Sequence, residues 1–218
     1  MKAALWDMDD TVLNTLPARM RALAHAYETC LGSRTDPLAL WRSHRGGTLE
    51  AMGQRLLGKD GPRFVREYRD FYYNDPHRAV AYEGIPDVLA ACKQAGLSMG
   101  IVTSKISHGA IDELEDAGVL QYFGTVVAVD DTERHKPDAE PVFTALERLC
   151  IDEPEDAVFV GDSPADIFAA RNAGCTSIAA LWGALDEQLT LDASPVHTAR
   201  TPQDVLRVIE LRMAVQTA

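Results

Sequence analysis

The chain has 218 residues, of which 46% are hydrophobic and 25% are charged, as in an ordinary globular protein. This length is enough for one large domain, or for a core with a smaller domain inserted into it. The formal net charge of −12 excludes the electrostatic footprint of a protein that binds nucleic acid or an anionic membrane surface.

The four cysteines lie far apart, and no Cys-x-x-Cys spacing occurs. We therefore expect small buried thiols in a reducing compartment, with no disulfide framework and no zinc site. No apolar run approaches the ~18 residues that a membrane helix needs. Met1 and Lys2 lead directly into the first predicted strand, so we expect no signal peptide and a soluble, cytoplasmic protein.

The first predicted strand is a short apolar run at residues 3–6, and it ends at three carboxylates within four residues: Asp7, Asp9 and Asp10. Carboxylates this close repel each other by about 4 kcal/mol per pair at ~4 Å and an effective dielectric constant near 20. A bound cation is the usual means of offsetting this repulsion. An acidic turn that faces water is the alternative interpretation when the motif is taken alone.

Residues 16–81 carry helical patterns and no strand signal. Apolar residues recur at helical spacing from Leu16 to Leu31, and Gly32 is a suitable end for that helix. A second helical stretch at 41–57 is interrupted at 45–48, and an aromatic stripe between Phe64 and Tyr72 predicts a third. We expect a small all-helical domain at 16–81, inserted into a core made of residues 1–15 and 82–218.

From residue 82 onward, strands alternate with helices of about ten residues. The predicted strands are 98–103, 125–129, 157–160 and 176–181, and the predicted helices are near 85–96, 107–117, 138–150 and 164–173. A weak strand near Val196 and a helix at 202–213 follow, whereas residues 183–200 otherwise give little signal. This alternation predicts an α/β fold with a doubly wound, Rossmann-like parallel sheet.

Polar side chains follow several of these strands. Thr103 and Ser104 end one strand, Asp162 follows Gly161 at the end of another, and Lys136 stands before a proline. Ligands of open α/β sheets bind beyond the carboxyl ends of the strands, so we expect these side chains to meet. Taken singly, each has a structural interpretation: a cap for Thr103 or Asp162, and a surface lysine for Lys136.

The acidic residues suit two kinds of chemistry. Asp162 and Asp166 lie one helical turn apart, and together with Asp7 they form an all-oxygen set that favours Mg²⁺ over Ca²⁺. Asp7 is anionic at neutral pH, so it can attack an electrophile without a general base. Asp9 points to the same side of an extended chain and suits proton transfer. The Asp9–Thr11 turn can offer backbone N–H groups to an anion.

The run Asp7-Met8-Asp9-Asp10-Thr11, Thr103 after an apolar strand, Lys136-Pro137 and Gly161-Asp162-x-x-x-Asp166 together resemble the haloacid dehalogenase superfamily. The resemblance implies that Asp7 is the nucleophile and that Asp9 protonates the leaving oxygen and then activates water. It implies phosphate binding by Asp7, Met8, Asp9, Thr103, Ser104 and Lys136. The implied Mg²⁺ ligands are Asp7, the backbone carbonyl of Asp9, and Asp162, with Asp166 behind them or linked through water.

The position of the helical insert resembles the subgroup with a helical cap, which includes phosphoglycolate phosphatases, a bacterial inorganic pyrophosphatase and β-phosphoglucomutase. Residues 126–141 look most like the first two. Such caps close over the substrate, so the resemblance implies substrate contacts from His44, Arg45 and Thr48; a simple helix–helix turn is the alternative. Asp10 departs from the family pattern, which usually has glycine at this position.

We therefore expect a Mg²⁺-dependent phosphatase that hydrolyses a small phosphorylated metabolite through an aspartyl-phosphate, with phosphoglycolate as the first substrate to test and pyrophosphate as the second. A phosphosugar mutase is a further alternative. A signalling domain that accepts phosphate without turnover is an alternative of another class, and a degenerate binding module ranks last. No nucleic acid or membrane partner is expected, and the sequence does not distinguish a monomer from a homodimer.

Overall fold

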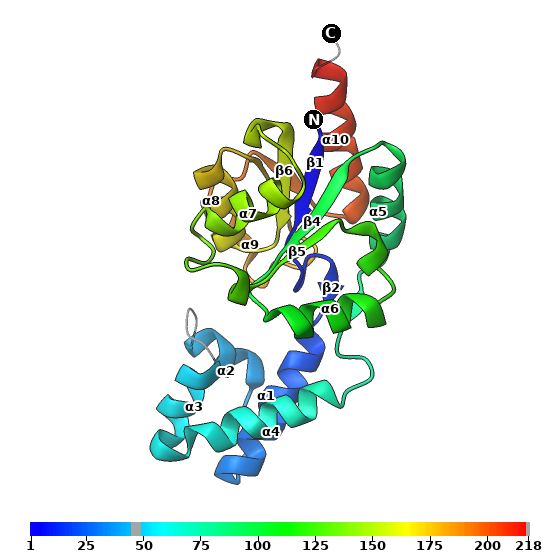
Figure 1. Cartoon of the computed structure of the whole chain (residues 1–218). Coiled ribbons are helices and arrows are strands. Elements are labelled where there is room, and N and C mark those ends of the chain that lie inside the picture. Colours follow the sequence, from blue (N-terminus) through cyan, green and yellow to red (C-terminus); the bar gives the residue numbers. More distant parts are fainter. Residues whose placement is uncertain (45–48, 217–218) are drawn as a thin grey trace. The chain divides into compact units, whose positions relative to one another are not determined.

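The computed structural model describes residues 1–44 and 49–216 (Figure 1). The chain divides into two compact units: residues 1–14 together with 81–218, and residues 15–80. The first unit contains a six-stranded sheet, and the second is helical in its described part, apart from the start of a two-residue strand at its end.

The six-stranded sheet has the strand order β5-β4-β1-β6-β7-β8, and each neighbouring pair is parallel. The strands are β1 (Ala3–Trp6), β4 (Ser98–Val102), β5 (Thr125–Val127), β6 (Ala157–Gly161), β7 (Thr176–Ala180) and β8 (His197–Ala199). Every residue of β1, β6 and β7 is buried, as expected for a parallel sheet covered on both faces. The predicted α/β, Rossmann-like class is confirmed.

Helices cover both faces of this sheet (Figure 1). They are α5 (Ile85–Gln94), α6 (Ser107–Asp116), α7 (Glu140–Arg148), α8 (Pro164–Ala173), α9 (Glu187–Asp192) and α10 (Pro202–Gln216), with short 3-10 turns η2 (Leu120–Tyr122), η3 (Val129–Asp131) and η4 (Pro154–Asp156). On one face, α7 and α8 pack over β1, β5 and β6 through a cluster that includes Leu5, Val142 and Phe159. On the other face, α5 packs against α10.

The strand register determines where the polar ends of the strands lie. Trp6 of β1 pairs with Ile101 of β4 on one side and with Val160 of β6 on the other. The residues that follow these three are therefore level with one another at the carboxyl edge of the sheet. The Asp7 N–H extends this pairing by donating to the Val160 carbonyl oxygen at 2.8 Å.

The helical unit contains α1 (Leu16–Leu31), α2 (Pro37–Ser43), α3 (Leu49–Leu57), the 3-10 turn η1 (Gly58–Asp60) and α4 (Gly61–Tyr73). Its main core consists of buried apolar side chains from all four α-helices: Leu23, Ala26, Leu40, Met52 and Phe64. At Gly53 and Gly61, α3 and α4 approach so closely that a Cβ on Gly53 would lie 2.7 Å from the Gly61 carbonyl oxygen.

Three elements differ from the sequence-based expectation. Helix α2 begins at Pro37, whereas the sequence pattern predicted a start near residue 41. The Asp36 carboxylate caps this earlier start by accepting from the N–H groups of Leu38 and Ala39. The short helix α9 has a similar cap, since Asp186 accepts from Leu189 N–H at 3.2 Å. A two-residue strand, β3 (Val80–Ala81), pairs with β2 (Leu13–Asn14) in a separate sheet. These caps and short pairings leave no hydrophobic period in the sequence.

Among the helices of residues 1–44 and 49–216, none has both the length and the apolar character to cross a membrane.

Candidate active site

Three carboxylates meet at the carboxyl edge of the sheet. Asp7 follows β1, Asp162 follows β6, and Asp166 lies in the first turn of α8. One oxygen atom from each lies within 4.8 Å of the other two. Asp7 is 6% exposed and Asp166 2%. Asp162 is half-buried, so the three segments build one largely buried acidic cluster.

The ammonium group of Lys136 lies within this cluster. Its Nζ donates to a carboxylate oxygen of Asp7, to Asp166 Oδ1 at 2.7 Å and to the Val102 carbonyl oxygen at 3.0 Å. Because Val102 is the last residue of β4, this one side chain connects the ends of β1 and β4 with the start of α8. The side chain of Lys136 is only 6% exposed, so it is not the solvated surface lysine of the alternative interpretation.

Burial and mutual repulsion perturb the acid–base properties of the cluster. Burial raises the pKa of Asp7 to about 7, with Lys136 opposing and Asp166 adding to the shift. Burial, together with the charges of Asp7 and Asp166, also holds the pKa of Asp162 well above its ordinary value. Burial alone would lower the pKa of Lys136, but its two carboxylate partners reverse this, and the net shift is upward. The protein alone therefore does not fully stabilise the ionised form of these carboxyl groups.

Neighbouring groups hold Asp162 and Asp166 in place. Ser163 donates to Asp166 Oδ2 from its backbone N–H at 3.1 Å and from its hydroxyl at 2.6 Å. The Thr11 hydroxyl donates to Asp162 Oδ1 at 3.2 Å. A Cβ on Gly161 would lie 2.7 Å from Asp166 Oδ2, so this strand end has room only for glycine. Asp162 thus interacts with the turn that follows β1 and is not simply a helix cap.

The turn after Asp7 is tightly closed. Val12 N–H and Leu13 N–H both donate to the Met8 carbonyl oxygen, at 3.0 and 2.9 Å. Asp10 has φ 59°, in the left-handed region. Glycine enters this region without strain, and Asp is among the few other residues that do so routinely. This requirement of the backbone accounts for the family's usual glycine and for the acceptance of Asp10 here.

A second segment packs against this turn. Trp182 Nε1 donates to the Thr11 carbonyl oxygen at 3.0 Å. A Cβ on Gly183 would overlap the carbonyl oxygen of Asp10 and lie 2.6 Å from its carbonyl carbon. Neither contact could be foreseen from the sequence, because Trp182 and Gly183 follow the last residue of a predicted strand and belong to no periodic pattern.

The two hydroxyl residues at the end of β4 have different surroundings. Thr103 is 5% exposed, its N–H donates to the Val127 carbonyl oxygen at 2.9 Å, and its hydroxyl oxygen accepts from Lys105 N–H at 3.2 Å. Ser104 is exposed. Thr103 therefore has the fixed position, whereas Ser104 faces solvent.

Asp9 has a partner that the sequence analysis missed. Its Oδ1 lies 3.3 Å from Lys105 Nζ, and Lys105 also forms an ion pair with Glu113 of α6. The carboxylate of Asp9 is not part of the three-carboxylate cluster; the resemblance assigns only its backbone carbonyl to the metal. The sequence does hold one signal of this ion pair. Glu113 lies on the same face of α6 as Ala110 and Leu114, and a charged residue within an apolar stripe needs a partner.

The predicted substrate contacts lie in the helical unit. His44 is the residue that follows α2 and caps its C-terminus, and its Nδ1 lies 2.9 Å from the Leu40 carbonyl oxygen of that helix. Arg45 and Thr48 lie outside the described residues.

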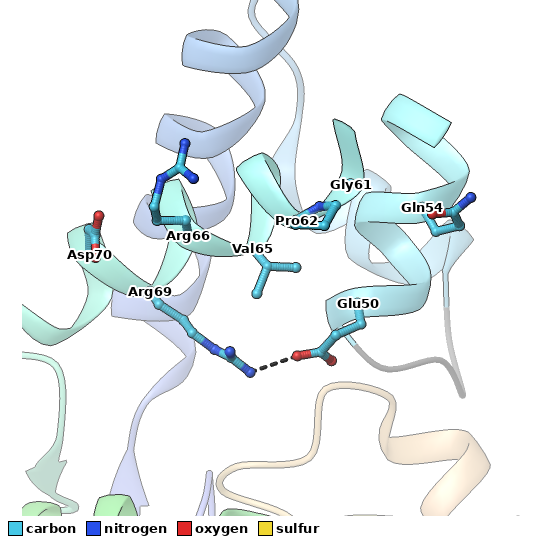
Figure 2. Close-up of a pocket in the computed structure, with 8 residues that line it drawn as sticks. All are labelled: Glu50, Gln54, Gly61, Pro62, Val65, Arg66, Arg69 and Asp70. Carbon is cyan, nitrogen blue, oxygen red and sulfur yellow. Dashed lines mark hydrogen bonds and ion pairs between the residues drawn. The ribbon is translucent and has the colours of Figure 1, made fainter. Parts of the chain in front are cut away.

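The helical unit also has a hollow of about 490 Å³ between α3 and α4, shown in Figure 2. An ion pair crosses it, with Arg69 Nη2 2.6 Å from Glu50 Oε1. The rest of its lining combines apolar and charged groups: Gln54, Gly61, Pro62, Val65, Arg66 and Asp70. Its lining holds none of the residues that the sequence analysis singled out as site candidates.

The donor set of the acidic cluster fits a small hard dication. All three candidate ligands are carboxylates, which Mg²⁺ and Ca²⁺ prefer, and Mg²⁺ usually takes one or two protein carboxylates while keeping several waters. Burial and mutual repulsion raise the pKa of both Asp7 and Asp162, so a bound dication would stabilise the ionised form of the cluster.

A parallel α/β sheet with carboxylates at its carboxyl edge is an arrangement that metal-assisted enzymes can use, and comparison with known proteins identifies the family. Residues 4–180 match the model of the family described as haloacid dehalogenase-like hydrolase. The chain belongs to this family, so the resemblance inferred from the motifs and the expectation of a hydrolase are confirmed.

Curated relatives cover most of the chain. A phosphoglycolate phosphatase from Salmonella typhi is 32% identical over 212 residues, which is 84% of this chain and 82% of the relative. A pyrophosphatase PpaX from Bacillus velezensis is 30% identical over 210 residues, covering 94% and 95%. The crystal structure of a predicted phosphoglycolate phosphatase from Haemophilus somnus 129pt superposes with a TM-score of 0.85 at 21% identity, over 96% of this chain and 98% of that one. This last likeness concerns the fold.

Proposed function

We propose that this chain is a Mg²⁺-dependent phosphatase that hydrolyses a small phosphorylated metabolite through an aspartyl-phosphate on Asp7. The observation that carries the proposal is the meeting of Asp7, Asp162 and Asp166, two of which, Asp7 and Asp166, bind the ammonium of Lys136. Phosphoryl transfer depends mainly on positioning and on stabilising negative charge, and this arrangement serves both.

In the first step, an oxygen of Asp7 attacks the phosphorus atom, and the bond from phosphorus to the leaving oxygen breaks. Asp9 gives its proton to that oxygen. In the second step, Asp9 takes a proton from water, the water oxygen attacks phosphorus, and the bond to Asp7 breaks. Phosphate leaves, and both aspartates return to their initial states.

Other residues bind and neutralise the phosphoryl group. Lys136 places a positive charge beside Asp7, and the Thr103 hydroxyl at the end of β4 is our candidate for a hydrogen bond to a phosphoryl oxygen. We assign backbone N–H groups of Met8 and Asp9 to the same role. Asp7, the Asp9 carbonyl, Asp162 and Asp166 would hold the Mg²⁺, which, when bound, neutralises charge on the phosphoryl group.

Phosphoglycolate is the first substrate to test, and pyrophosphate is the second. Relatives named for each activity align with most of the chain at similar identity, so neither substrate is preferred by similarity alone. We place the choice between them in the helical unit and assign substrate contacts there to His44, Arg45 and Thr48. His44→Ala should then change KM for the preferred substrate more than kcat.

The test is a phosphate-release assay with phosphoglycolate, pyrophosphate and a panel of phosphate esters, each with Mg²⁺ and with a chelator. We expect Mg²⁺-dependent turnover of one substrate class, and its loss by at least about 10³-fold in Asp7→Asn. A melting temperature near that of the wild type would show that the variant is folded.

Retained turnover in Asp7→Asn would disprove the assignment of the nucleophile. Phosphate uptake without turnover would favour the signalling-domain alternative, and isomerisation of a phosphosugar without phosphate release would favour a mutase.

A further inference from the structure

Lys105 is a charged side chain at the active-site end of β4 to which the proposed mechanism gives no role. Its Nζ lies 3.3 Å from Asp9 Oδ1 and forms an ion pair with Glu113 Oε2. The side chain of Lys105 is 18% exposed and that of Asp9 21%, whereas that of Glu113 is 1% exposed. All three residues belong to the unit that contains the sheet.

The backbone of Lys105 is fixed on both sides. Its N–H donates to the Thr103 hydroxyl oxygen at 3.2 Å, and its carbonyl oxygen accepts from Val129 N–H at 2.9 Å. The helix that carries Glu113 is anchored as well, because Asp130 accepts from the backbone N–H and the hydroxyl of Ser107 at its first turn, both at 2.8 Å. The backbones of both residues are therefore held in place, and the side chains of Lys105 and Glu113 extend toward each other.

Complete burial of Glu113 is costly. Glutamate is almost never fully buried unless it is paired, and burying an ion pair stabilises a fold less than apolar residues of similar volume often do. The pair thus has a stability cost that packing alone does not account for. A lysine side chain is long and flexible, so an ammonium that must stay beside one carboxylate needs a second anchor. Glu113 supplies that anchor.

We infer that Lys105 and Glu113 are positioning residues for the carboxyl group of Asp9, and that Glu113 acts through Lys105. This inference rests on the proposed function, in which the proton of Asp9 passes to the leaving oxygen as the bond from that oxygen to phosphorus breaks. Proton transfer requires its donor within hydrogen-bond reach, and a misplacement of about 1 Å costs on the order of 10²-fold in rate.

The predicted signature depends on the leaving group. An alkoxide leaving group needs the proton of Asp9, whereas p-nitrophenolate is stable enough to leave with little help. The experiment measures kcat/KM, which reports the steps through the first phosphoryl transfer, for the preferred alkyl phosphate and for p-nitrophenyl phosphate. In Lys105→Met we expect a loss of about 10²-fold for the alkyl ester and a clearly smaller loss for the aryl ester.

A second variant separates positioning from stability. Lys105→Met leaves the Glu113 carboxylate buried without its lysine, and that alone destabilises the fold. The double variant Lys105→Met/Glu113→Leu removes both charges and should restore the melting temperature. We expect the selective loss on the alkyl ester to persist in this folded protein. Arg148→Met, which breaks the ion pair with Asp131 at 2.8 Å, is the matched control and should leave both kcat/KM values unchanged.

The outcomes are distinct. Recovery of alkyl-ester activity together with the melting temperature in the double variant would show a purely structural pair and overturn the inference. Equal losses on both esters would overturn it as well. A wild-type protein that hydrolyses neither ester nor pyrophosphate would instead overturn the proposed function itself.

Discussion

Replacing Lys136 by methionine removes the ammonium group that pairs with Asp7 and Asp166 in the acidic cluster. The carboxylate oxygens of this cluster lie within 4.8 Å of one another, so each ionised pair repels by roughly 3.5 kcal/mol or more at an effective dielectric constant near 20. Removing one partner of a buried ion pair costs about 3–5 kcal/mol. For a chain of this length, that corresponds to a decrease of about 6–20 °C in melting temperature.

This loss should depend on pH and on metal. At pH 8, with a chelator, the carboxylates of Lys136→Met carry more negative charge than at pH 5.5, so the loss should be greater there. At pH 5.5, protons on the cluster relieve the repulsion. Millimolar Mg²⁺ at pH 8 should restore much of the stability, because the dication replaces the missing positive charge. The loss of kcat should remain in every condition, since phosphate neutralisation by the lysine is absent.

Tryptophan fluorescence can follow the unfolding of the sheet-containing unit alone. Trp41 belongs to the helical unit, whereas Trp6 and Trp182 belong to the sheet-containing unit, so a Trp41→Phe background reports only the latter. Lys2→Met is the matched control, because Lys2 pairs with Asp156 at 2.7 Å but is 64% exposed. Its melting temperature should change by at most about 4 °C. A loss in Lys136→Met that is the same at both pH values and insensitive to Mg²⁺ would refute the electrostatic reasoning.

Three further predictions follow from the same geometry. The pKa of Asp7 is raised to about 7 in the metal-free fold, so the folded state binds more protons than the unfolded chain between pH 4 and 7, and stability should fall as pH rises through that window. Denaturation with and without Mg²⁺ should therefore show more stabilisation by Mg²⁺ at pH 8 than at pH 5.5. Gly183→Ala pushes a methyl group into the Asp10 carbonyl. We expect the free energy of unfolding, measured by urea denaturation, to fall by about 1–3 kcal/mol and kcat/KM to fall by about 10²-fold. A fully active variant would contradict the packing of this turn. Asp162→Asn should raise the Mg²⁺ concentration for half-maximal activity by at least about tenfold. A Mg²⁺ titration of the variant that matches the wild type would contradict the assignment of Asp162 as a metal ligand.

The sequence allowed the sheet and the acidic cluster to be predicted for the same reason. The carboxyl ends of parallel strands lie at the same edge of the sheet, so polar residues that follow apolar strands lie at that edge. The register of Trp6 with Val160 then brings Asp7 level with Gly161, the residue before Asp162. That inference needs only the strand positions and the fold class. The backbone position of Asp10 was less accessible, because a left-handed residue other than glycine has no clear sequence signature.

Contacts that depend on packing between distant segments could not be predicted. Gly183 is recognisable as a close approach only once the Asp10 carbonyl lies against it. The place of Glu113 on the apolar face of α6 hints that it is buried, but only the packing of α6 shows that its partner is Lys105. Short elements held by one capping carboxylate, such as α9 with Asp186, also lack the hydrophobic period that reveals longer helices.

In the proposed mechanism, Asp7 carries the phosphoryl group during turnover, within a cluster that Lys136 and a dication neutralise. The most direct test is to quench the enzyme during turnover, reduce the acyl phosphate with borohydride and locate the product by peptide mass spectrometry. We expect homoserine at position 7, dependent on both substrate and Mg²⁺. Homoserine at another aspartate, or an unmodified Asp7 while phosphate is being released, would contradict it.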